Sequence, residues 1–483
     1  MSRFRARMTK PIVYRQPPVA GGSPLTIVVD ANVTSGVAPL GVIFDATGTT
    51  HADSGIDTFR SIAYSHDFGD SGAGSWTYYG VDSDKNVHRG GPLTAHVYET
   101  PGTYTYKVRG LDANGNVDQQ EITITVTDPD TVYAGTDTIC ISTGTDMTGA
   151  PAGATQLTNQ TSWPAESDNK RYLLRRGDDF SSFGAWSISG RTGVYIGAYG
   201  SGAKPIMDRF TGTYSYCRRV DLDMRSSLVG TKGTGTIGED LGTGSYNVYC
   251  RNEWSNGALF AVIGSDGGDT GKARQGVVFY DCSVASTAST YPNNTGYGMY
   301  FVAGSYFAFL GWSFNSNLNY HPIRIPRGYK GVFQHCLCAV TNGDSSGNNG
   351  YDLFKWHAEG LDNWPADNNF TGLNPASAYG SIEENQFGNG TEAFSEAVTV
   401  EPQNDASAEG MEYFMMARNK FLKNFGTDFA LGGRYLVARG NFMSSPATGS
   451  PNYNTNHHAG SLPPEWLGPY YTSDSDPTFS DPG

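Results

Sequence analysis

Charged residues and long apolar runs are both scarce in this sequence. Only 17% of its 483 residues are charged, and the formal net charge is −14. A strongly acidic chain is a poor partner for nucleic acid or for an anionic membrane surface, so neither is expected to bind it. No run of about 18 apolar residues occurs, and therefore no membrane insertion is predicted.

Cysteine is also sparse, and it lacks the spacing of a metal site. The sequence has six cysteines and no paired CxxC pattern. Cys336 and Cys338 alternate on a predicted strand, so both point to one face. We expect buried free thiols, with one or two disulfides as the alternative. No metal and no cofactor is predicted. The cysteines are Cys140, Cys217, Cys250, Cys282, Cys336 and Cys338.

A long amphipathic helical period is missing from the second half of the chain, whereas glycine and aromatic residues are abundant. The sequence has 62 glycines, 29 tyrosines and 24 phenylalanines. Such a composition is typical of β-rich proteins with many turns. The predicted fold class is therefore all-β.

Residues 298–443 repeat one pattern, in which a short apolar strand, a polar corner and a second strand follow each other. The first strands begin at 298, 321, 352, 397 and 428. Uneven steps with a constant core pattern predict a solenoid, whose insertions, such as 358–380, bulge outward. We expect a right-handed parallel β-helix over 129–443. Its predicted internal stack is Phe314, Leu337, Phe387, Phe421 and Phe442, and Asn385, Asn419 and Asn441 are expected to hydrogen-bond at the corner before it.

Residues 25–128 form a separate predicted β-sandwich. Its marks are Ala38–Thr47 (APLGVIFDAT), Tyr64–Asp70 (YSHDFGD), His96–Val108 (HVYETPGTYTYKV) and a closing alternating strand. These segments resemble the PKD family of immunoglobulin-like domains, whose members usually serve as spacers or adhesive modules. His66 stands where that family usually has Trp, so different core packing is expected there. Asp112–Asp118 departs from a calcium loop and is predicted to be a hairpin turn.

The two ends of the chain lack a core pattern. Residues 1–24 combine basic residues with prolines, which favours a disordered arm or one that becomes ordered on a partner. Arg3, Arg5 and Arg7 would then meet acidic groups of a capsid or tail protein. Residues 444–483 are rich in Pro, Asn and Ser, and predict an irregular tail.

Alternation along the predicted strands places several polar residues on one outer face. Arg324, Lys355, His357 and Glu401 would lie on adjacent rungs, about 4.8 Å apart. In a uronate lyase, Arg324 would neutralise the sugar carboxylate, and Lys355 or His357 would remove a proton. A glycosidase would instead use two carboxylates, Glu359 with Glu401 or Asp352 with Glu401. The simpler interpretation is an ordinary solvated face.

Aromatic residues near the 358–380 insertion are candidates for sugar binding. Trp356, Glu359 and Trp364 are the predicted substrate-binding residues, because an exposed ring can stack on a sugar face. The alternative is that these rings pack the insertion against the body. Trp356 also fits a core position in its strand.

Two early segments extend the predicted β-helix. Tyr172–Asp179 (YLLRRGDD) and Thr192–Pro205 (TGVYIGAYGSGAKP) resemble the opening of right-handed β-helix repeat proteins. Many of those are polysaccharide lyases, glycoside hydrolases or phage tailspikes. The resemblance implies work outside the cell, yet Met1 is followed by no recognisable export signal.

These features together favour a phage virion surface protein, as a capsid decoration or a tailspike-like binder of cell-surface polysaccharide. A homotrimer is expected, because β-helix spikes resemble one another in assembling as trimers. The alternatives are a secreted polysaccharide lyase or glycoside hydrolase, which leaves enzymatic activity open, and a bacterial surface adhesin. The expected location is the virion surface or the extracellular space.

Overall fold

The structure is a computed structural model of the 483-residue chain. Among the residues that it describes, no helix combines the length and apolarity needed to cross a membrane. The basic arm with Arg3, Arg5 and Arg7, the insertion residue Trp364 and most of the tail lie outside the described residues. The described residues are 23–77, 84–225, 239–240, 244–255, 261–263, 274–285, 299–301, 304–316, 323–325, 328–340, 352–359, 377–388, 396–403, 411–422, 427–431, 434–443, 453–454, 466–467 and 470–471.

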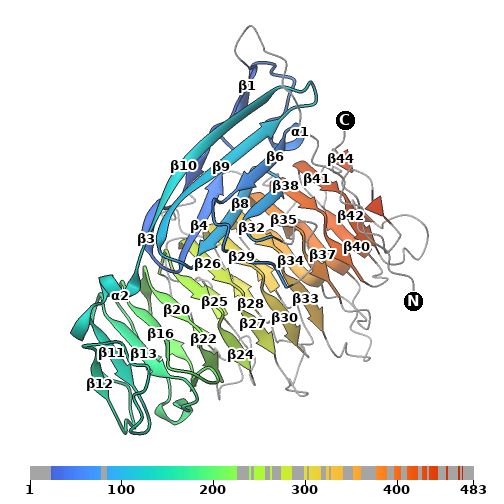
Figure 1. The fold of residues 1–483 in the computed structure, drawn as a ribbon. Helices are drawn as coiled ribbons and strands as arrows, with labels where there is room; N and C mark the ends of the chain where they lie inside the picture. Colours follow the sequence, from blue (N-terminus) through green and yellow to red (C-terminus); the bar gives the residue numbers. More distant parts are fainter. Residues whose placement is uncertain are drawn as a thin grey trace, which may run out of the picture.

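The first unit is a sandwich of two sheets, which confirms the predicted β-sandwich (Figure 1). A short pair, β1 (Leu25–Thr26) with β5 (Thr50–His51), and the helix α1 (Thr58–Ser61) complete it. The larger sheet has the order β3 (Ser35–Val37), β10 (Val117–Thr127), β9 (Gly102–Leu111), β6 (Ala63–Asp67), β7 (Val87–Gly90), and the smaller has β2 (Asp30–Ala31), β4 (Leu40–Asp45), β8 (Leu93–Tyr98).

The core of the sandwich contains the histidine that the PKD resemblance singled out. His66 is fully buried, and its Nε2 donates to the Gly91 carbonyl at 3.0 Å. Its Nδ1 is then left to accept from the Tyr106 hydroxyl at 2.7 Å. Tyr106 in turn stacks on Phe44 of the other sheet. The residues 112–116 form the predicted turn, since Leu111 pairs with Val117 across an antiparallel hairpin.

The second unit begins after the linker helices α2 (Pro129–Val132) and η1 (Gly135–Asp137) and consists of three stacked sheets. Neighbouring strands in all three sheets are parallel, so the unit is a parallel β-helix. The predicted fold class is thereby confirmed. In Figure 1 the rungs run from the green end, near α2, to the red end.

Each complete rung contributes one strand to each sheet, and the three sheets are here called the long, middle and short sheets. The long sheet has 13 strands: β12 (Thr155–Leu157), β11 (Thr138–Ile141), β13 (Arg171–Arg175), β16 (Tyr195–Tyr199), β20 (Arg218–Val220), β23 (Val248–Cys250), β26 (Arg274–Tyr280), β29 (Gly304–Leu310), β32 (Gly328–Gln334), β35 (Ser377–Glu383), β38 (Met411–Ala417), β41 (Arg434–Arg439) and β44 (Trp466–Leu467).

The middle sheet has ten strands: β17 (Ile206–Met207), β21 (Asp223–Met224), β24 (Glu253–Ser255), β27 (Ser283–Ala285), β30 (Ser313–Ser316), β33 (Leu337–Val340), β36 (Gln386–Phe387), β39 (Lys420–Phe421), β42 (Asn441–Met443) and β45 (Tyr470–Tyr471). The short sheet has eight: β22 (Glu239–Asp240), β25 (Ala261–Ile263), β28 (Met299–Phe301), β31 (Ile323–Ile325), β34 (Asp352–Glu359), β37 (Glu396–Gln403), β40 (Thr427–Leu431) and β43 (Tyr453–Asn454). Two small pairs, β14 (Trp186–Ser187) with β18 (Phe210–Thr211) and β15 (Arg191–Thr192) with β19 (Tyr214–Ser215), and the turn η2 (Ser181–Phe183) lie in the first rungs.

The five predicted first strands are β28, β31, β34, β37 and β40, and each pairs with the next in the short sheet. The predicted second strand of each rung is in fact two strands, one in the long sheet and one in the middle sheet. One residue with a left-handed backbone, φ between 49° and 63°, separates them in every rung from β20 to β42. These corner residues are Asp221, Arg251, Asp281, Gly311, His335, Glu384, Arg418 and Gly440.

At six of the eight left-handed corners, the side chain directly after the corner ties one rung to the preceding rung, whereas Leu222 and Trp312 follow the other two. Asn419 Nδ2 donates to the Ile382 carbonyl at 2.8 Å and to Asn441 Oδ1 at 3.0 Å. Its Oδ1 accepts from the Asn385 backbone N–H at 3.0 Å. The predicted corner role of Asn385, Asn419 and Asn441 is therefore confirmed, and the same place in other rungs holds Asn252, Cys282 and Cys336.

The two cysteine corners show that a thiol can replace the amide there. Cys282 Sγ donates to the Tyr249 carbonyl, and Cys336 Sγ donates to the Phe309 carbonyl, both at 3.4 Å. These carbonyls occupy the same register position as Ile382 in their own rungs. All six cysteines are free and buried, which confirms that expectation, and burial raises the pKa of each thiol.

The predicted internal stack is wrong by one residue in two rungs. Phe314, Phe387 and Phe421 do lie in one column, but the register places Cys338 between Phe314 and Phe387 and Met443 after Phe421. Leu337 and Phe442 stand one position earlier. A slip of one residue along a strand moves a side chain to the opposite face, so the position of the left-handed corner decides the result.

The β-helix also continues beyond the predicted boundary at residue 443. The strands β43, β44 and β45 pair with β40, β41 and β42, respectively. Parts of 444–483 therefore form a further rung instead of the irregular tail that composition indicated. Tyrosine and tryptophan in these two-residue strands extend the sheets despite the many turn-forming residues around them.

The sandwich docks on the outer surface of the long sheet (Figure 1). Ile43 of β4 and Val97 of β8 belong to one buried cluster with Val278, Leu310 and Val332 of the β-helix. Strand alternation alone would leave these β-helix residues exposed to water. The docked sandwich removes their apolar surface from water, at about 1.5–3 kcal/mol for each fully buried side chain.

We predict that Asn419→Ala lowers the free energy of unfolding by about 2 kcal/mol or more, because the Asn385 N–H would be buried without a partner and the Ile382 carbonyl would lose a hydrogen bond. Urea unfolding measures the change. Asn114→Ala, in the exposed turn of the β9–β10 hairpin, is the matched control and is expected to cost less than about 0.5 kcal/mol. Equal losses in the two variants would show that the corner amide is dispensable.

Candidate functional site

The polar row predicted from alternation lies on the short sheet. Strand register pairs Arg324 of β31 with Lys355 of β34, and Lys355 with Thr399 of β37. Two residues further along, His357 pairs with Glu401. The backbone thus brings the four predicted catalytic residues to three adjacent rungs, about 4.8 Å apart.

The described side chains of this row are less exposed than a solvated face would require. Arg324 is buried, at 6% exposure, and Lys355 is half-buried, and both make interactions within the structure. The side chains of His357, Glu359 and Glu401 lie outside the described residues. A catalytic role for the row stays a prediction.

Register also separates the two carboxylate pairs that a glycosidase could use. Asp352 pairs with Glu396, five residues before Glu401, which corresponds to about 16 Å along a strand. That separation is too long for either glycosidase geometry, about 5–5.5 or 6.5–9.5 Å. Glu359 pairs with Gln403, only two residues beyond Glu401, so Glu359 with Glu401 is the pair that the backbone permits.

Trp356 does not form a sugar-stacking surface. Its side chain is fully buried inside the β-helix, with ring centroids 5.2 Å from Phe307 and 5.0 Å from Phe414. The predicted binding role of Trp356 is therefore wrong, while its predicted core position is confirmed. A Cβ at Gly331 would collide with both Phe307 and Trp356, so only glycine at this position of the neighbouring rung leaves space for the Trp356 ring.

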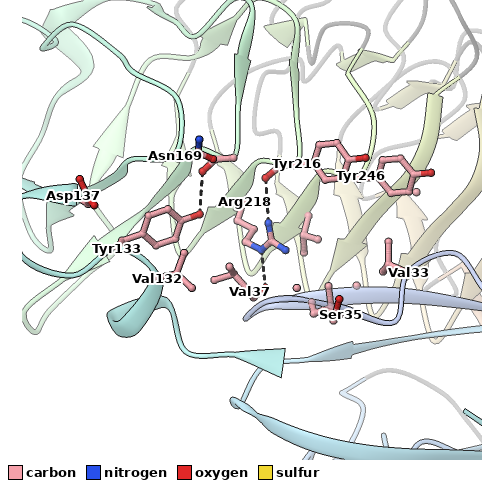
Figure 2. A pocket seen from close by; sticks show the side chains of 16 residues that line it. Val33, Ser35, Val37, Val132, Tyr133, Asp137, Asn169, Tyr216, Arg218 and Tyr246 are labelled. Atoms are coloured by element: carbon pink, nitrogen blue, oxygen red, sulfur yellow. Dashed lines mark hydrogen bonds between the residues drawn. The ribbon is translucent and has the colours of Figure 1, made fainter. Parts of the chain in front are cut away.

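A second site, which the pattern of residues 298–443 did not reveal, lies between the sandwich and the start of the β-helix (Figure 2). It is a pocket of about 350 Å³, here called the junction pocket. The β-helix side comes from one column of left-handed residues just before the long-sheet strands or, at Gly276, near the start of one, and the sandwich side comes mainly from β3 and the start of β4. Its column residues are Asn169, Gly193, Tyr216, Tyr246 and Gly276.

Tyr216 presents an aromatic ring in this pocket. The residue is 51% exposed, and its ring stacks on Tyr246 with centroids 4.9 Å apart and planes 11° apart. In the preceding rung the column position is Gly193, which has no side chain to cover the second face of the ring. The column recurs at positions 216, 246, 276 and 306, and this period of 30 residues is the sequence signal that could have revealed it.

Arg218 lines the same pocket and holds the sandwich in place. Figure 2 shows that its Nε donates to the Val37 carbonyl at 2.8 Å and its Nη1 to the Tyr216 carbonyl at 3.1 Å. The Nε also donates to the Pro39 carbonyl at 3.2 Å. The side chain is buried, at 8% exposure, and burial lowers its pKa from the usual value. Among the described residues, no carboxylate lies within ion-pair distance of Arg218.

A third cluster of polar side chains is buried between the sandwich and the β-helix. Arg418 bridges two buried carboxylates, with Nη2 2.8 Å from Glu384 Oε1 and 3.3 Å from Glu383 Oε2. The sandwich contributes the Gly91 N–H, which donates to Glu383 Oε1 at 3.1 Å, and His88, 3.7 Å from the same oxygen. Because all these side chains are buried, the cluster can fix the docking of the two units but has no surface for a substrate.

Burial and charge shift the pKa values of this cluster strongly. Burial opposes ionisation of Glu383, but His88, Arg418 and the Gly91 N–H outweigh it and hold the pKa of that carboxyl at about 2. Burial lowers the pKa of His335 to about 3, although Glu384 lies 3.6 Å away and opposes the shift. The imidazole of His335 and the carboxylate of Glu383 therefore both resist protonation in the folded protein.

No protein-family model matches the chain, and no curated protein matches it. Among solved structures, the Agl-KA catalytic domain is similar at 10% identity, with 90% of each chain covered and a TM-score of 0.32. The tailspike protein gp49 from Pseudomonas phage LKA1 shares 8% identity over 93% of this chain and 64% of its own, with a TM-score of 0.25. The family 28 exopolygalacturonase of Yersinia enterocolitica shares 8% identity over 94% of this chain and 99% of its own, with a TM-score of 0.25.

These similarities concern the fold alone, and no functional conclusion rests on them. The strand register by itself defines the class to which the chain belongs, an all-β protein with a β-sandwich docked on a parallel β-helix. The PKD resemblance of the sandwich is not confirmed by any family model.

We predict that acidification from pH 7 to pH 4 lowers the free energy of unfolding. The imidazole of His335 takes up a proton near pH 6.5 when unfolded but only near pH 3 when folded, so its contribution is complete above 6.5 and is lost as the pH falls towards 3. Urea unfolding at several pH values measures the slope. In His335→Gln the slope between pH 6.5 and 4 is expected to be shallower, and an unchanged slope would contradict this assignment.

Proposed function

We propose that this chain is a glycan-binding β-helix protein displayed on the surface of a phage particle, as a capsid decoration or a tailspike-like receptor binder. The observation that carries the proposal is the register of Arg324, Lys355 and Thr399 on adjacent rungs. A row of cationic and hydroxyl side chains at a repeat of about 4.8 Å suits a linear polysaccharide that bears negative charges.

The second candidate function is cleavage of such a polysaccharide. Lys355 beside Arg324 fits a lyase, in which one cation neutralises the sugar carboxylate while a base removes a proton. The Glu359 and Glu401 positions, on adjacent strands and two residues apart, fit a hydrolase instead. Both versions use the same outer face of the short sheet.

Assembly as a homotrimer belongs to the same proposal. The sandwich covers the outer face of the long sheet from Val220 to Val437. The subunits would therefore meet through other faces of the β-helix. Basic residues of the arm, Arg3, Arg5 and Arg7, would attach each subunit to an acidic capsid or tail protein.

We predict that Lys355→Ala weakens binding of an anionic polysaccharide about tenfold, because a charge-assisted hydrogen bond is lost. If the polysaccharide is cleaved, the turnover number is expected to fall about a hundredfold or more in Lys355→Ala or in His357→Ala. Calorimetry and product analysis measure the two effects. Lys107→Ala, which removes an exposed lysine of the sandwich, is the matched control and is expected to change neither.

Binding and cleavage that are unaltered in both Lys355→Ala and His357→Ala would remove these residues from the site. Binding without cleavage of any glycan would leave the receptor-binding function and exclude the enzymatic one.

We predict that deletion of the arm leaves a folded protein that no longer joins the particle. The deletion is best ended at residue 22, because the Pro24 carbonyl accepts from the Ala52 N–H and belongs to the sandwich. Thermal melting verifies folding, and protein analysis of purified particles measures incorporation. A variant with Arg3, Arg5 and Arg7 all changed to Glu separates loss of charge from loss of length.

Normal incorporation of the truncated protein would make the sandwich the attachment element. Absence of the full-length chain from purified particles would contradict the virion assignment altogether.

A further inference from the structure

We propose that the junction pocket binds a carboxylated sugar residue, with the sugar ring on Tyr216 and the carboxylate at Arg218. This inference rests on the proposed glycan-binding function and adds a site separate from the polar row of the short sheet. A pocket of 350 Å³ lies near the lower end of ligand-binding pockets, about 300–1,000 Å³, and suits one terminal sugar residue.

The charge of Arg218 points to an anionic ligand. Within the described part of the chain, the guanidinium hydrogen-bonds only to three carbonyl oxygens, through Nε and Nη1, and Nη2 makes no hydrogen bond. The ionisable groups that favour its charge are Tyr133, Cys217 and Tyr195, which carry no charge at neutral pH. Burying a cation without an anion is costly, and a ligand carboxylate at Nη2 would remove that cost.

The surroundings of Arg218 leave room for such a contact. Gly36 of the sandwich lines the pocket, and a Cβ at Gly36 would lie 3.2 Å from Nη2. A larger residue there would cover this donor. Asp137 also lines the pocket, but its carboxylate is held by Lys170 at 2.6 Å, so its negative charge is partly neutralised.

The ring of Tyr216 points to a sugar as the body of the ligand. An exposed aromatic face fits the apolar C–H face of a pyranose, whose hydroxyl groups stay free for hydrogen bonds at its edge. Tyr246 stacks behind Tyr216 and fixes its orientation. The side chains of Asn169 and Ser35, both exposed at the pocket, can hydrogen-bond the sugar hydroxyls.

The site exists only while the two units are docked, because β3 supplies Ser35, Gly36 and Val37, and the β-helix supplies Tyr216 and Arg218. A ligand that binds the docked form alone stabilises it. Binding is therefore expected to raise the melting temperature of the full chain.

The experiment compares charged sugars with their neutral forms on the full chain. Oligomers of galacturonate and of sialic acid are the two charged probes, and their methyl esters are the neutral controls. Calorimetry is expected to show binding of at least one charged oligomer and affinity about tenfold or more lower for its ester. Which oligomer binds identifies the source of the carboxylate.

The protein variant used in the test removes the Tyr216 ring and keeps the left-handed backbone conformation at this position. Tyr216→Asn copies Asn169, which holds the same left-handed position two rungs earlier with φ 55°. This variant is expected to bind the charged oligomer with about tenfold lower affinity. Tyr435→Asn, at the equivalent place in a distant rung, is the matched control, and its affinity for the oligomer is expected to equal that of the unaltered protein.

Three results would overturn the inference: equal affinity for acid and ester, full binding by Tyr216→Asn, or no binding of either charged oligomer at millimolar concentration. Lys355→Ala separates this inference from the proposed function. If Lys355→Ala loses binding while Tyr216→Asn retains it, the glycan-binding function stands and the junction pocket is not the site. If no glycan of any charge binds, the proposed function itself fails.

Discussion

Hydrogen bonds from the corner side chains of six rungs to carbonyls of the preceding rung set the register on which the rest of the β-helix depends. Asn385 and Asn419 each hydrogen-bond both neighbouring rungs, whereas the thiol of Cys336, a weaker donor, reaches only the preceding rung. Register then determines which residues of every following strand face inward. The row of Arg324, Lys355 and Thr399 on the short sheet is a consequence of these corner contacts, since a slip of one residue would turn each of them into the core.

Docking of the sandwich determines which residue types can occupy the outer surface of the long sheet. Residues such as Val278 and Leu310 can be apolar there because β4 and β8 cover them. Polar contacts fix the position, including Lys330 to Asp45 and Lys85 to Asp281, both at 2.5 Å. The buried Glu383–Arg418 pair lies within the β-helix, and Glu383 meets the sandwich through the Gly91 N–H and His88, so another docking position would leave this buried carboxylate without those two partners.

The sequence was sufficient for the fold class, for five of the eight strands of the short sheet and for the corner role of Asn385, because strand patterns and amide corners are local features. It was insufficient for the third strand of each rung, since a single left-handed residue such as Glu384 or Arg418 leaves no sign in hydrophobic alternation. Because these left-handed corners were not recognised, Leu337 and Phe442 were wrongly assigned to the internal stack. The junction pocket was missed for a different reason: Tyr216 and Ser35 are 181 residues apart, and only docking brings them together.

One column of left-handed residues serves two purposes along the β-helix. Towards its C-terminal end the sandwich covers it: Asp45 binds both Tyr306 and Lys330, and Phe59 packs against the rings of Tyr379 and Tyr413. Near the start of the helix, glycine replaces the ring at 193 and 276, so the column there cannot form a continuous stack. There the exposed ring of Tyr216, stacked on the partly buried Tyr246, lies near the buried cation of Arg218, and a ring beside a cation suits a carboxylated sugar.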